Sequence, residues 1–317
     1  MAIFIKNNVP SLVDMPALEF IKLGIHGVYT TMKTVTSYEY IFNFTLHMKN
    51  LHMYATNFLK LQINDNNKEC ITNILQSLTL ENICKYSSRN IKTGFEFLNA
   101  LNDDSKKKHF SENSNYMVMV TITWDIVNNK KYSLNVPFSI LCYIKCLPRH
   151  NSNVQIDIMC GERKLPNIKY SNVFDIREKL LKLKNEDSND VVLYNEKGEI
   201  TEGLTCNFFC FFENILYTAN DEYVLKGTTR EQIIDLCEKE GIKLKRESIN
   251  IRDVELFEFC FICSTTRNIL PVKKIILYSE NKKTFEKDVN HPVLLKLQQK
   301  LKEAIEKKKE KYDAYIC

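Results

Sequence analysis

The stretch GEITEGLTCNFFCFFENILYT, residues 198–218, decides the fold. Its centre, Phe208 to Phe212, is an almost unbroken apolar run, which is typical of a strand buried on both faces. Tight turns at the nearby sequences NEKG and EN predict that the surrounding sheet is largely antiparallel. Glu202 stands just before the apolar run, and a carboxylate at the edge of a core needs a cation or it takes up a proton. The neighbouring sequence shows no obvious cation, so we expect another molecule to bring one.

Composition and charge bound the class of protein. The chain has 317 residues, 44% of them apolar, and a net charge of +5, which fits two ordinary globular domains. We expect these domains at residues 1–147 and 154–317, joined by the linker CLPRHNSN. Much of the positive excess lies in a C-terminal run of alternating charge with Leu and Ile at helical spacing, which favours a solvated surface helix over nucleic-acid binding.

Location and metal binding are also constrained. No secretory leader and no apolar span of about 18 residues is apparent, and the eleven cysteines are irregularly spaced. We therefore expect a reduced, cytoplasmic protein with no membrane partner. Cys260 and Cys263 are three residues apart on a predicted strand and should point to opposite faces, so we expect no zinc site and no other metal.

The first half predicts a strand pair over Val28–Phe44, a helix from Thr45, and two more helices near residues 68–84 and 87–101. A polar surface insertion, residues 102–115, and two further strands follow. The second half predicts a strand over Val154–Met159 and a helix that starts near Tyr170. The antiparallel strands around Phe208 come next, followed by a helix after Gly227 that ends at Gly241.

Three local patterns in the second half carry possible chemistry. Lys169 follows a Pro-Asn turn and opens the helix predicted near Tyr170. Thr228 and Thr229 stand between a glycine and a helix, where free N–H groups, hydroxyls and the helix dipole form a phosphate cradle, although an ordinary N-cap has the same pattern. Thr265 lies in the Ser/Thr-rich turn after a buried strand, where simple capping is also an alternative.

These groups together fit pyridoxal phosphate. Its aldehyde requires a lysine, its phosphate requires N–H and hydroxyl donors, and its pyridine nitrogen requires an acidic partner. The cation expected beside Glu202 is then the protonated ring nitrogen itself.

The segments VVLYNEKGEITEGLTCNFF, KGTTREQIIDLCEKEGIKL and ELFEFCFICSTTRNILPV resemble the fold-type IV pyridoxal phosphate enzymes. These are the branched-chain aminotransferases, the D-amino-acid aminotransferases and the 4-amino-4-deoxychorismate lyases, and the resemblance extends over residues 26–272. It implies an α+β (α/β two-domain) fold, with a smaller N-terminal α/β domain and a larger, mostly antiparallel C-terminal domain with helices. It also implies a homodimer and a small-molecule substrate.

The resemblance implies roles for single residues. Lys169, in the KYSN pattern closed by Asn172, would form the Schiff base and move protons. Glu202, in the motif closed by Asn207, would bind the ring nitrogen. The phosphate would be held by Thr228, Thr229 and Thr265.

The N-terminal sequence GVYTTMKT resembles the lyases more than the aminotransferases. We therefore expect a lyase that converts 4-amino-4-deoxychorismate to 4-aminobenzoate and pyruvate in folate biosynthesis, with Tyr29, Thr31 and Arg267 contacting the substrate. The alternatives are a branched-chain or D-amino-acid aminotransferase and a non-catalytic member of the fold. The phosphate-binding arginine of the family is replaced by Asn50, and the candidates to compensate are Lys33, His47, Lys49 and Arg267.

Overall fold

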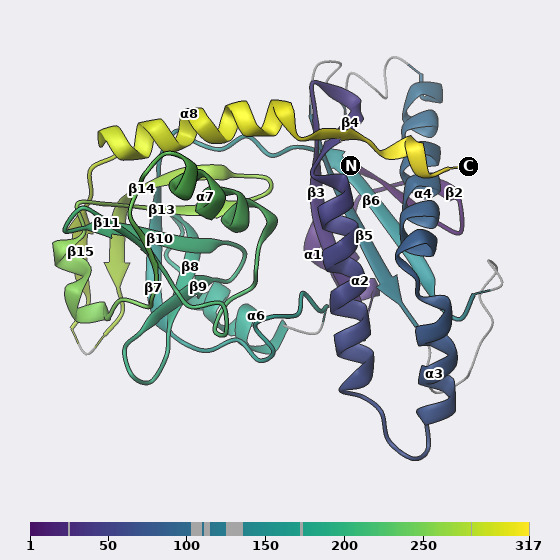
Figure 1. The fold of residues 1–317 in the computed structure, drawn as a ribbon, viewed down its shortest axis with the longest axis horizontal. Coiled ribbons are helices and arrows are strands. Elements are labelled where there is room, and N and C mark those ends of the chain that lie inside the picture. Colours follow the sequence, from purple (N-terminus) through teal and green to yellow (C-terminus); the bar gives the residue numbers. More distant parts are fainter. Residues whose placement is uncertain are drawn as a thin grey trace. The chain divides into compact units, whose positions relative to one another are not determined.

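The computed structural model describes residues 1–24, 26–102, 110, 115–124, 136–171, 174–279 and 281–316. The chain forms two compact units, which Figure 1 shows as ribbons. The first unit contains Met1–Pro148, Ile168–Asn172 and Ile305–Cys317, and the second contains Arg149–Asn167 and Val173–Ala304. The boundary at residues 148/149 falls inside the predicted linker. Two short segments that the sequence assigned to the C-terminal domain lie instead with the first unit.

The first unit is built on a seven-stranded antiparallel sheet. Its strands, in spatial order, are β16 (Lys309–Lys311), β4 (Ser37–Phe42), β3 (Val28–Val35), β5 (Tyr116–Thr123), β6 (Ser139–Cys146), β1 (Ala2–Lys6) and β2 (Val9–Val13). Among the described residues, its helices are α1 (Ala17–Leu23), α2 (Phe44–Lys60), α3 (Lys68–Ser77), α4 (Leu80–Ala100) and the 3₁₀ turn η2 (Tyr312–Tyr315).

Helices pack on both faces of this sheet. Gly94 of α4 lies against Ile5 and Ile144, while Phe20 of α1 stacks on Tyr143 at 5.0 Å between ring centroids. Because neighbouring residues of a strand point to opposite faces, α1 and α4 cover opposite sides.

The second unit contains β7 (Val154–Cys160), β8 (Ser188–Tyr194), β9 (Ile200–Gly203), β10 (Asn207–Phe212), β11 (Ile215–Thr218), β12 (Leu244–Arg246), β13 (Phe259–Ser264), β14 (Asn268–Leu277) and β15 (Lys283–Glu286). Its helices are α6 (Phe174–Leu183), α7 (Thr228–Lys239), most of α8 (Pro292–Lys307) and the 3₁₀ turn η1 (Ile251–Leu256).

The main sheet of the second unit closes on itself. The pairings run from β10 through β13, β14, β7, β8 and β9 and return to β10 through the pair Asn207 and Glu202. Closure of this kind removes exposed strand edges. Glu202 therefore sits at the seam of the ring, and this backbone pairing fixes its position.

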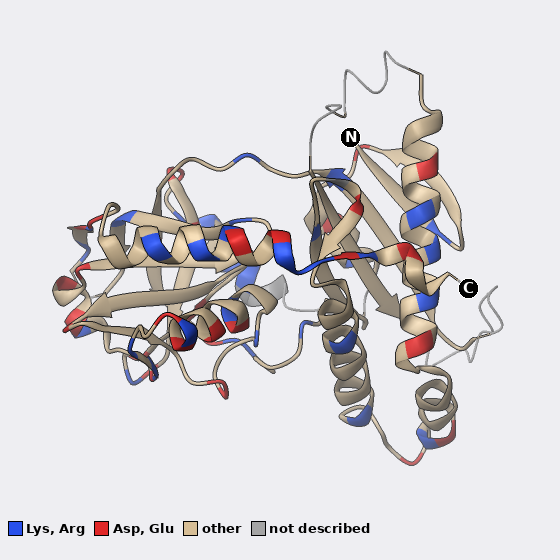
Figure 2. Cartoon of the chain, turned by 45° about the horizontal axis from the view of Figure 1, so that its top comes forward, with Lys and Arg blue, Asp and Glu red and all other residues tan. Residues whose placement is uncertain are grey.

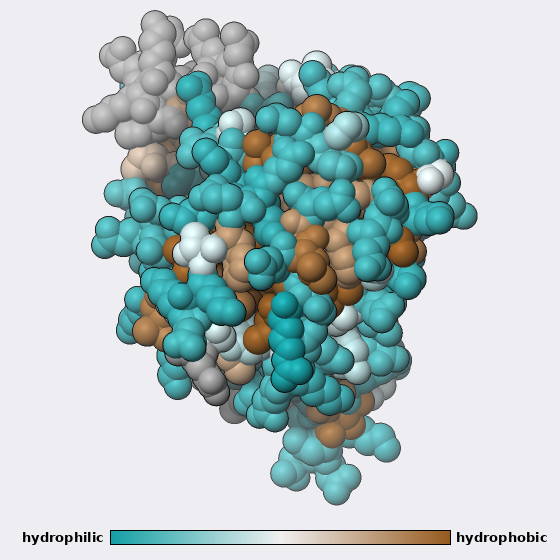
Figure 3. All heavy atoms as spheres, turned by 90° about the vertical axis from the view of Figure 1, so that its left-hand side faces the viewer, coloured by the Kyte–Doolittle hydropathy of each residue, from teal (hydrophilic) through white to brown (hydrophobic). Residues whose placement is uncertain are grey.

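The buried strand predicted at Phe208–Phe212 is confirmed as β10. Phe209 stacks on Phe261 at 4.9 Å and Phe211 stacks on Phe259 at 4.7 Å between centroids, while Phe208 and Cys210 belong to a large apolar core. On the face of the molecule drawn in Figure 3, hydrophobic atoms form small groups separated by hydrophilic ones.

The C-terminal amphipathic helix is confirmed as α8. Its residues Leu294, Leu297, Leu301 and Ile305 are buried, whereas Leu295 is 48% exposed. Figure 2 shows both charge signs along this helix. Within the described ranges, no helix combines the length and apolar character needed to cross a bilayer, and no three metal-ligating side chains cluster.

Two helix predictions were wrong in detail. Tyr170 does not start a helix but forms an isolated antiparallel bridge with Val28, and α6 begins at Phe174. The two helices after α2 break at residues 78 and 79, because the Thr79 hydroxyl caps the next helix by accepting from Asn82 N at 3.1 Å. Most of the polar insertion at 102–115 lies outside the described residues.

Candidate active site

Glu202 is a buried carboxylate, 2% exposed, held by donors from three directions. Its Oε2 accepts hydrogen bonds from Leu225 N at 3.0 Å and from Asn207 Nδ2 at 3.3 Å. Its Oε1 lies 3.2 Å from Arg163 Nη1, in an ion pair in which both side chains are largely buried. Hydrogen bonds and a neighbouring cation both favour the charged form of a carboxylate, so the site presents a preformed anion.

The expectation that no protein cation accompanies Glu202 was wrong. Arg163 lies in the segment between β7 and Lys169, 39 residues before Glu202 in the chain. It stands in the charged sequence GERK, which has the pattern of an ordinary exposed loop. The loop follows β7, and β8 lies between β7 and the strand of Glu202, so the sheet brings the loop to the carboxylate and no local signal in the sequence indicates the pair.

The threonine pair begins α7, as predicted. Thr228 and Thr229 are buried, at 6% and 3% exposure, and the N-cap residue Gly227 has no side chain to cap the helix. Among the described residues, nothing makes a hydrogen bond to the buried Thr229 hydroxyl. A buried hydroxyl without a partner at an uncapped helix N-terminus is suited to an anionic ligand.

Thr265 lies next to this pair. Its hydroxyl is 3.4 Å from that of Thr228, so the two predicted Ser/Thr motifs meet in the fold. Glu202, Asn207 and Cys263 form one row across β9, β10 and β13, and Thr265 follows two residues after Cys263. Gly227 approaches the row so closely that a Cβ there would collide with Asn207 Oδ1. The second unit thus brings together Glu202, Asn207, Thr228, Thr229 and Thr265.

Lys169 is held by the first unit. Its carbonyl oxygen accepts from Tyr29 N at 2.9 Å, and Ser171 N donates to Gly27 O at 2.9 Å. The Ser171 hydroxyl also donates to Gly24 O and Gly27 O. Together with the isolated bridge between Tyr170 and Val28, these bonds hold the Lys169–Ser171 segment beside the start of β3 and fix the backbone of Lys169. Asn172, the last residue of the predicted KYSN pattern, lies outside the described residues.

Tyr29 and Thr31 lie on β3, the strand that hydrogen-bonds to the Lys169–Ser171 segment. The Lys169 ammonium is 5.2 Å from the centroid of the Tyr29 ring. Thr31 is half-buried. Thr30, between them, makes a 2.8 Å hydrogen bond with His47 Nδ1. Burial and, secondarily, the charge of Lys169 lower the pKa of His47 to about 3, so this imidazole is neutral.

Arg267 was predicted to contact a substrate carboxylate, but it has partners inside the second unit. Its Nη1 lies 3.2 Å from Asp190 Oδ2 and 2.7 Å from Thr205 Oγ1. Asp190 is 2% exposed and also accepts from Thr205. Arg267 therefore ties the β9–β10 turn to the β13–β14 turn.

The residues considered as replacements for the phosphate arginine differ in environment. His47 is neutral, Arg267 is paired with Asp190, and Lys49 is exposed. Lys33 is 5% exposed, and burial lowers its pKa to about 8. Its ammonium lies 5.8 Å from the centroid of the Phe42 ring.

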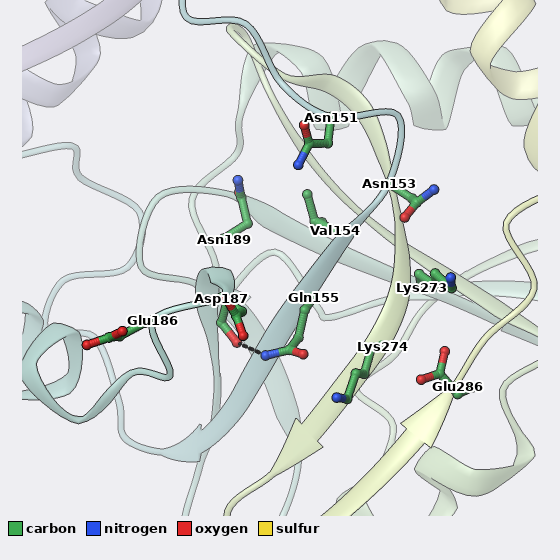
Figure 4. Close-up of a pocket in the computed structure, with 11 residues that line it drawn as sticks. Asn151, Asn153, Val154, Gln155, Glu186, Asp187, Asn189, Lys273, Lys274 and Glu286 are labelled. Atoms are coloured by element: carbon green, nitrogen blue, oxygen red, sulfur yellow. Dashed lines mark hydrogen bonds between the residues drawn. The ribbon is translucent and has the colours of Figure 1, made fainter.

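A separate polar pocket of about 500 Å³ lies at the start of β7 and β8 in the second unit. It is lined by asparagines and by carboxylates and lysines on β8, β14, β15 and their connections, as Figure 4 shows. None of the predicted site residues lines it.

Comparison with known proteins places this geometry in a family. Residues 27–275 match the family described as amino-transferase class IV. The chain belongs to that family, whose members use pyridoxal phosphate, and the predicted fold class is confirmed.

Curated relatives match over a shorter stretch. The chain is 31% identical over 87 residues to a protein of Rickettsia bellii named "Probable branched-chain-amino-acid aminotransferase", covering 27% of this chain and 30% of that one. It is 34% identical over 98 residues to a D-alanine aminotransferase of Listeria monocytogenes, covering 30% and 34%. The matches thus span about a third of the length of these relatives.

Solved structures match along nearly the whole chain. A branched-chain aminotransferase from Thermoproteus uzoniensis superposes with a TM-score of 0.68 at 15% identity, covering 99% of this chain and 97% of that one. The pyridoxal phosphate form of a branched-chain aminotransferase from Thermobaculum terrenum superposes with a TM-score of 0.61 at 14% identity, covering 99% and 96%. At these identities the likeness establishes the fold.

The residues of this chain fit the family cofactor. A preformed carboxylate suits a protonated ring nitrogen, and the Thr229 hydroxyl at an uncapped helix start suits a phosphate. A lysine on a fixed backbone suits an aldehyde. The cofactor predicted from the sequence is therefore supported by both the family and the side chains present.

Proposed function

We propose that this protein is a pyridoxal phosphate-dependent aminotransferase that acts on an amino acid with a small or branched aliphatic side chain. The observation that carries the proposal is the Glu202 site: a buried, ion-paired carboxylate in the same unit as the Thr228, Thr229 and Thr265 hydroxyls. The substrate class comes from the relatives, which are named branched-chain and D-alanine aminotransferases.

Each site residue has a proposed role. Thr228, Thr229 and Thr265, with the first N–H groups of α7, bind the phosphate, and Glu202 holds the proton of the ring nitrogen. Lys169 would hold the cofactor through its amine and would serve as the base and acid that moves a proton at the substrate carbon. The bound cofactor supplies an electron sink for the carbon that loses the proton.

The lyase is kept as a second candidate because of one observation. The strand that carries Tyr29 and Thr31 is the one that hydrogen-bonds to Lys169, so the motif that resembles the lyases lies directly beside the proposed catalytic amine. The second argument for a lyase, a substrate contact from Arg267, is weakened because Arg267 is paired with Asp190.

The test uses purified protein loaded with pyridoxal phosphate. An aminotransferase should convert leucine, valine or D-alanine only when 2-oxoglutarate is supplied as amino acceptor. A lyase should release pyruvate from 4-amino-4-deoxychorismate with no acceptor. A protein that binds the cofactor but does neither would contradict both candidates.

Lys169→Ala tests the site itself. We expect loss of the visible absorption band of the bound cofactor and a fall in turnover of at least about 1,000-fold, because the residue is proposed both to hold the cofactor and to move the proton. Lys164→Ala, an exposed lysine five residues earlier, is the matched control and should behave as the parent protein. A coloured, active Lys169→Ala protein would refute the assignment.

We also propose a homodimer, as the resemblance to the family implies, and a cytoplasmic location, which fits the irregularly spaced cysteines. Sedimentation of the active protein tests the first point, since a fully active monomer would contradict it. Fractionation of cells that express the protein tests the second.

A further inference from the structure

We propose that Arg230 is a positioning residue, which sets the hydrogen bond to Glu202 by fastening the loop between β11 and α7. This inference extends the proposed function of the Glu202 site. The loop comprises residues 219–227 and is called the 219–227 loop below.

Arg230 is unusual for an arginine because it is completely buried. Its Nη2 donates to Ala219 O at 2.8 Å and lies 2.9 Å from Asp221 Oδ1, so one guanidinium nitrogen binds the first residues of the loop. Its Nη1 lies 2.8 Å from Glu231 Oε1. A planar guanidinium with several fixed donors can hold a backbone oxygen and carboxylates at once.

The far end of the same loop binds the proposed active site. Leu225 N donates to Glu202 Oε2 at 3.0 Å, and Asn207 Nδ2 donates both to Leu225 O, at 2.9 Å, and to Glu202 Oε2. Gly227 N donates back to Leu225 O at 2.8 Å. Glu202, Asn207 and Leu225 therefore form one hydrogen-bonded unit at this end of the loop.

The contacts at the two ends of the 219–227 loop indicate the role of Arg230. The loop is anchored at Ala219 and Asp221 by a side chain of α7, and at Leu225 by Glu202 and Asn207. Since Arg230 directly follows Thr228 and Thr229, the first turn of α7 carries both the proposed phosphate donors and the anchor of the loop. Without Arg230, the hydrogen bond from Leu225 N to Glu202 should open more often, while the ring of strands stays intact.

Asp221 offers a matched control. It also pairs with Arg246 on β12, at 2.8 Å, and that side chain is 43% exposed. Arg246→Ala removes a cation from the same carboxylate without touching the buried contact to Ala219. If the buried contacts of Arg230 anchor the loop, then Arg230→Met should accelerate hydrogen exchange in residues 219–227. Arg246→Ala should leave that exchange unchanged.

The first experiment measures amide hydrogen exchange in the full-length protein without added cofactor. In Arg230→Met we expect peptides from residues 219–227 to exchange about tenfold faster or more, equivalent to about 1.4 kcal/mol, because the loop would lose its hydrogen bond to a charged group. Peptides of β7, β8 and β13 should keep their rates, Arg230→Lys should be intermediate, and Arg246→Ala should match the parent. Unchanged exchange in the loop, or equal acceleration in all strands, would overturn the proposal.

The second experiment titrates the same four proteins with pyridoxal phosphate. The dissociation constant should rise about tenfold in Arg230→Met and stay within about twofold of the parent in Arg246→Ala. Equal constants in Arg230→Met and the parent would overturn the link from the loop to the cofactor. A parent protein that binds no pyridoxal phosphate would instead refute the proposed function, and the exchange experiment distinguishes that result from failure of the anchor.

Discussion

At the scale of single residues, removal of either partner of the Glu202–Arg163 ion pair should lower the free energy of unfolding. Arg163→Met would leave a 2%-exposed carboxylate without this cation. Breaking one half of a buried pair typically lowers the free energy of unfolding by about 3–5 kcal/mol. We expect a loss of about 3 kcal/mol, measured by urea unfolding of the protein without cofactor.

The double variant Arg163→Met/Glu202→Gln is the control for this prediction. It removes both charges, so most of the loss should be recovered. If the double variant instead lost as much free energy of unfolding as the two single variants together, the two charges would not stabilise each other in solution.

A second residue-scale prediction concerns acid sensitivity at His47. Its folded pKa of about 3 lies below the ordinary value of 6.5, so the unfolded chain binds more protons between these limits. The stability that neutral His47 provides is therefore complete above pH 6.5 and falls as the pH drops towards 3. The slope approaches about 1.4 kcal/mol per pH unit.

The measurement is urea unfolding between pH 4.5 and 7.5. His47→Gln should remove most of this pH dependence, whereas His52→Gln, one turn further along α2, should retain it. An unchanged pH profile in His47→Gln would show that another group is responsible.

At the scale of elements, Gly27 lets the chain just before β3 pass close to the backbone of β5. A Cβ at Gly27 would collide with the backbone oxygen of Ile122, which cannot swing aside as a side chain could. We expect Gly27→Ala to cost about 2–3 kcal/mol of stability. It should also weaken binding of pyridoxal phosphate, because the bonds from Gly27 to Ser171 flank Lys169.

Gly161→Ala provides the comparison. A Cβ there would meet only the methyl groups of Leu180 and Leu193, at 3.2 and 3.3 Å. Small shifts of these side chains would accommodate it, so the effect should stay below about 1 kcal/mol. Similar losses of stability in Gly27→Ala and Gly161→Ala would mean that the close approach to the Ile122 oxygen is not the cause of the loss in Gly27→Ala.

The elements also show what a sequence can reveal of this site. Phe208–Phe212, the start of α7 and the stripe of α8 were predictable because each follows from a local period or cap. Lys169 was wrongly placed at the start of a helix because its backbone hydrogen-bond partner, Tyr29, lies 140 residues away. Arg163 could not be matched with Glu202, nor Asp190 with Arg267, for the same reason, since pairing between distant segments leaves no local pattern.

At the scale of the whole molecule, the C-terminal segment completes the first unit. β16 pairs with β4 through Lys309 and Phe42, and Tyr312 is 5% exposed. Removal of residues 308–317 should lower the free energy of unfolding by about 3 kcal/mol or more, because it deletes a strand and uncovers a buried aromatic side chain. Lys302→Ala, on the exposed side of α8, should change it by less than about 0.5 kcal/mol. A truncated protein as stable as the parent would show that the segment is dispensable.

The path of the chain between the two units has a consequence for dissection of the protein. The polypeptide passes from one unit to the other at residues 148/149, 167/168, 172/173 and 304/305. A protease that cut once, near residue 148, would leave the N-terminal fragment without the Lys169 segment and without β16. The C-terminal product would contain the whole second unit together with the two segments that the first unit lacks. The first unit should therefore survive a nick only as a noncovalent complex of the two products, and separate expression of residues 1–148 should yield an incomplete sheet.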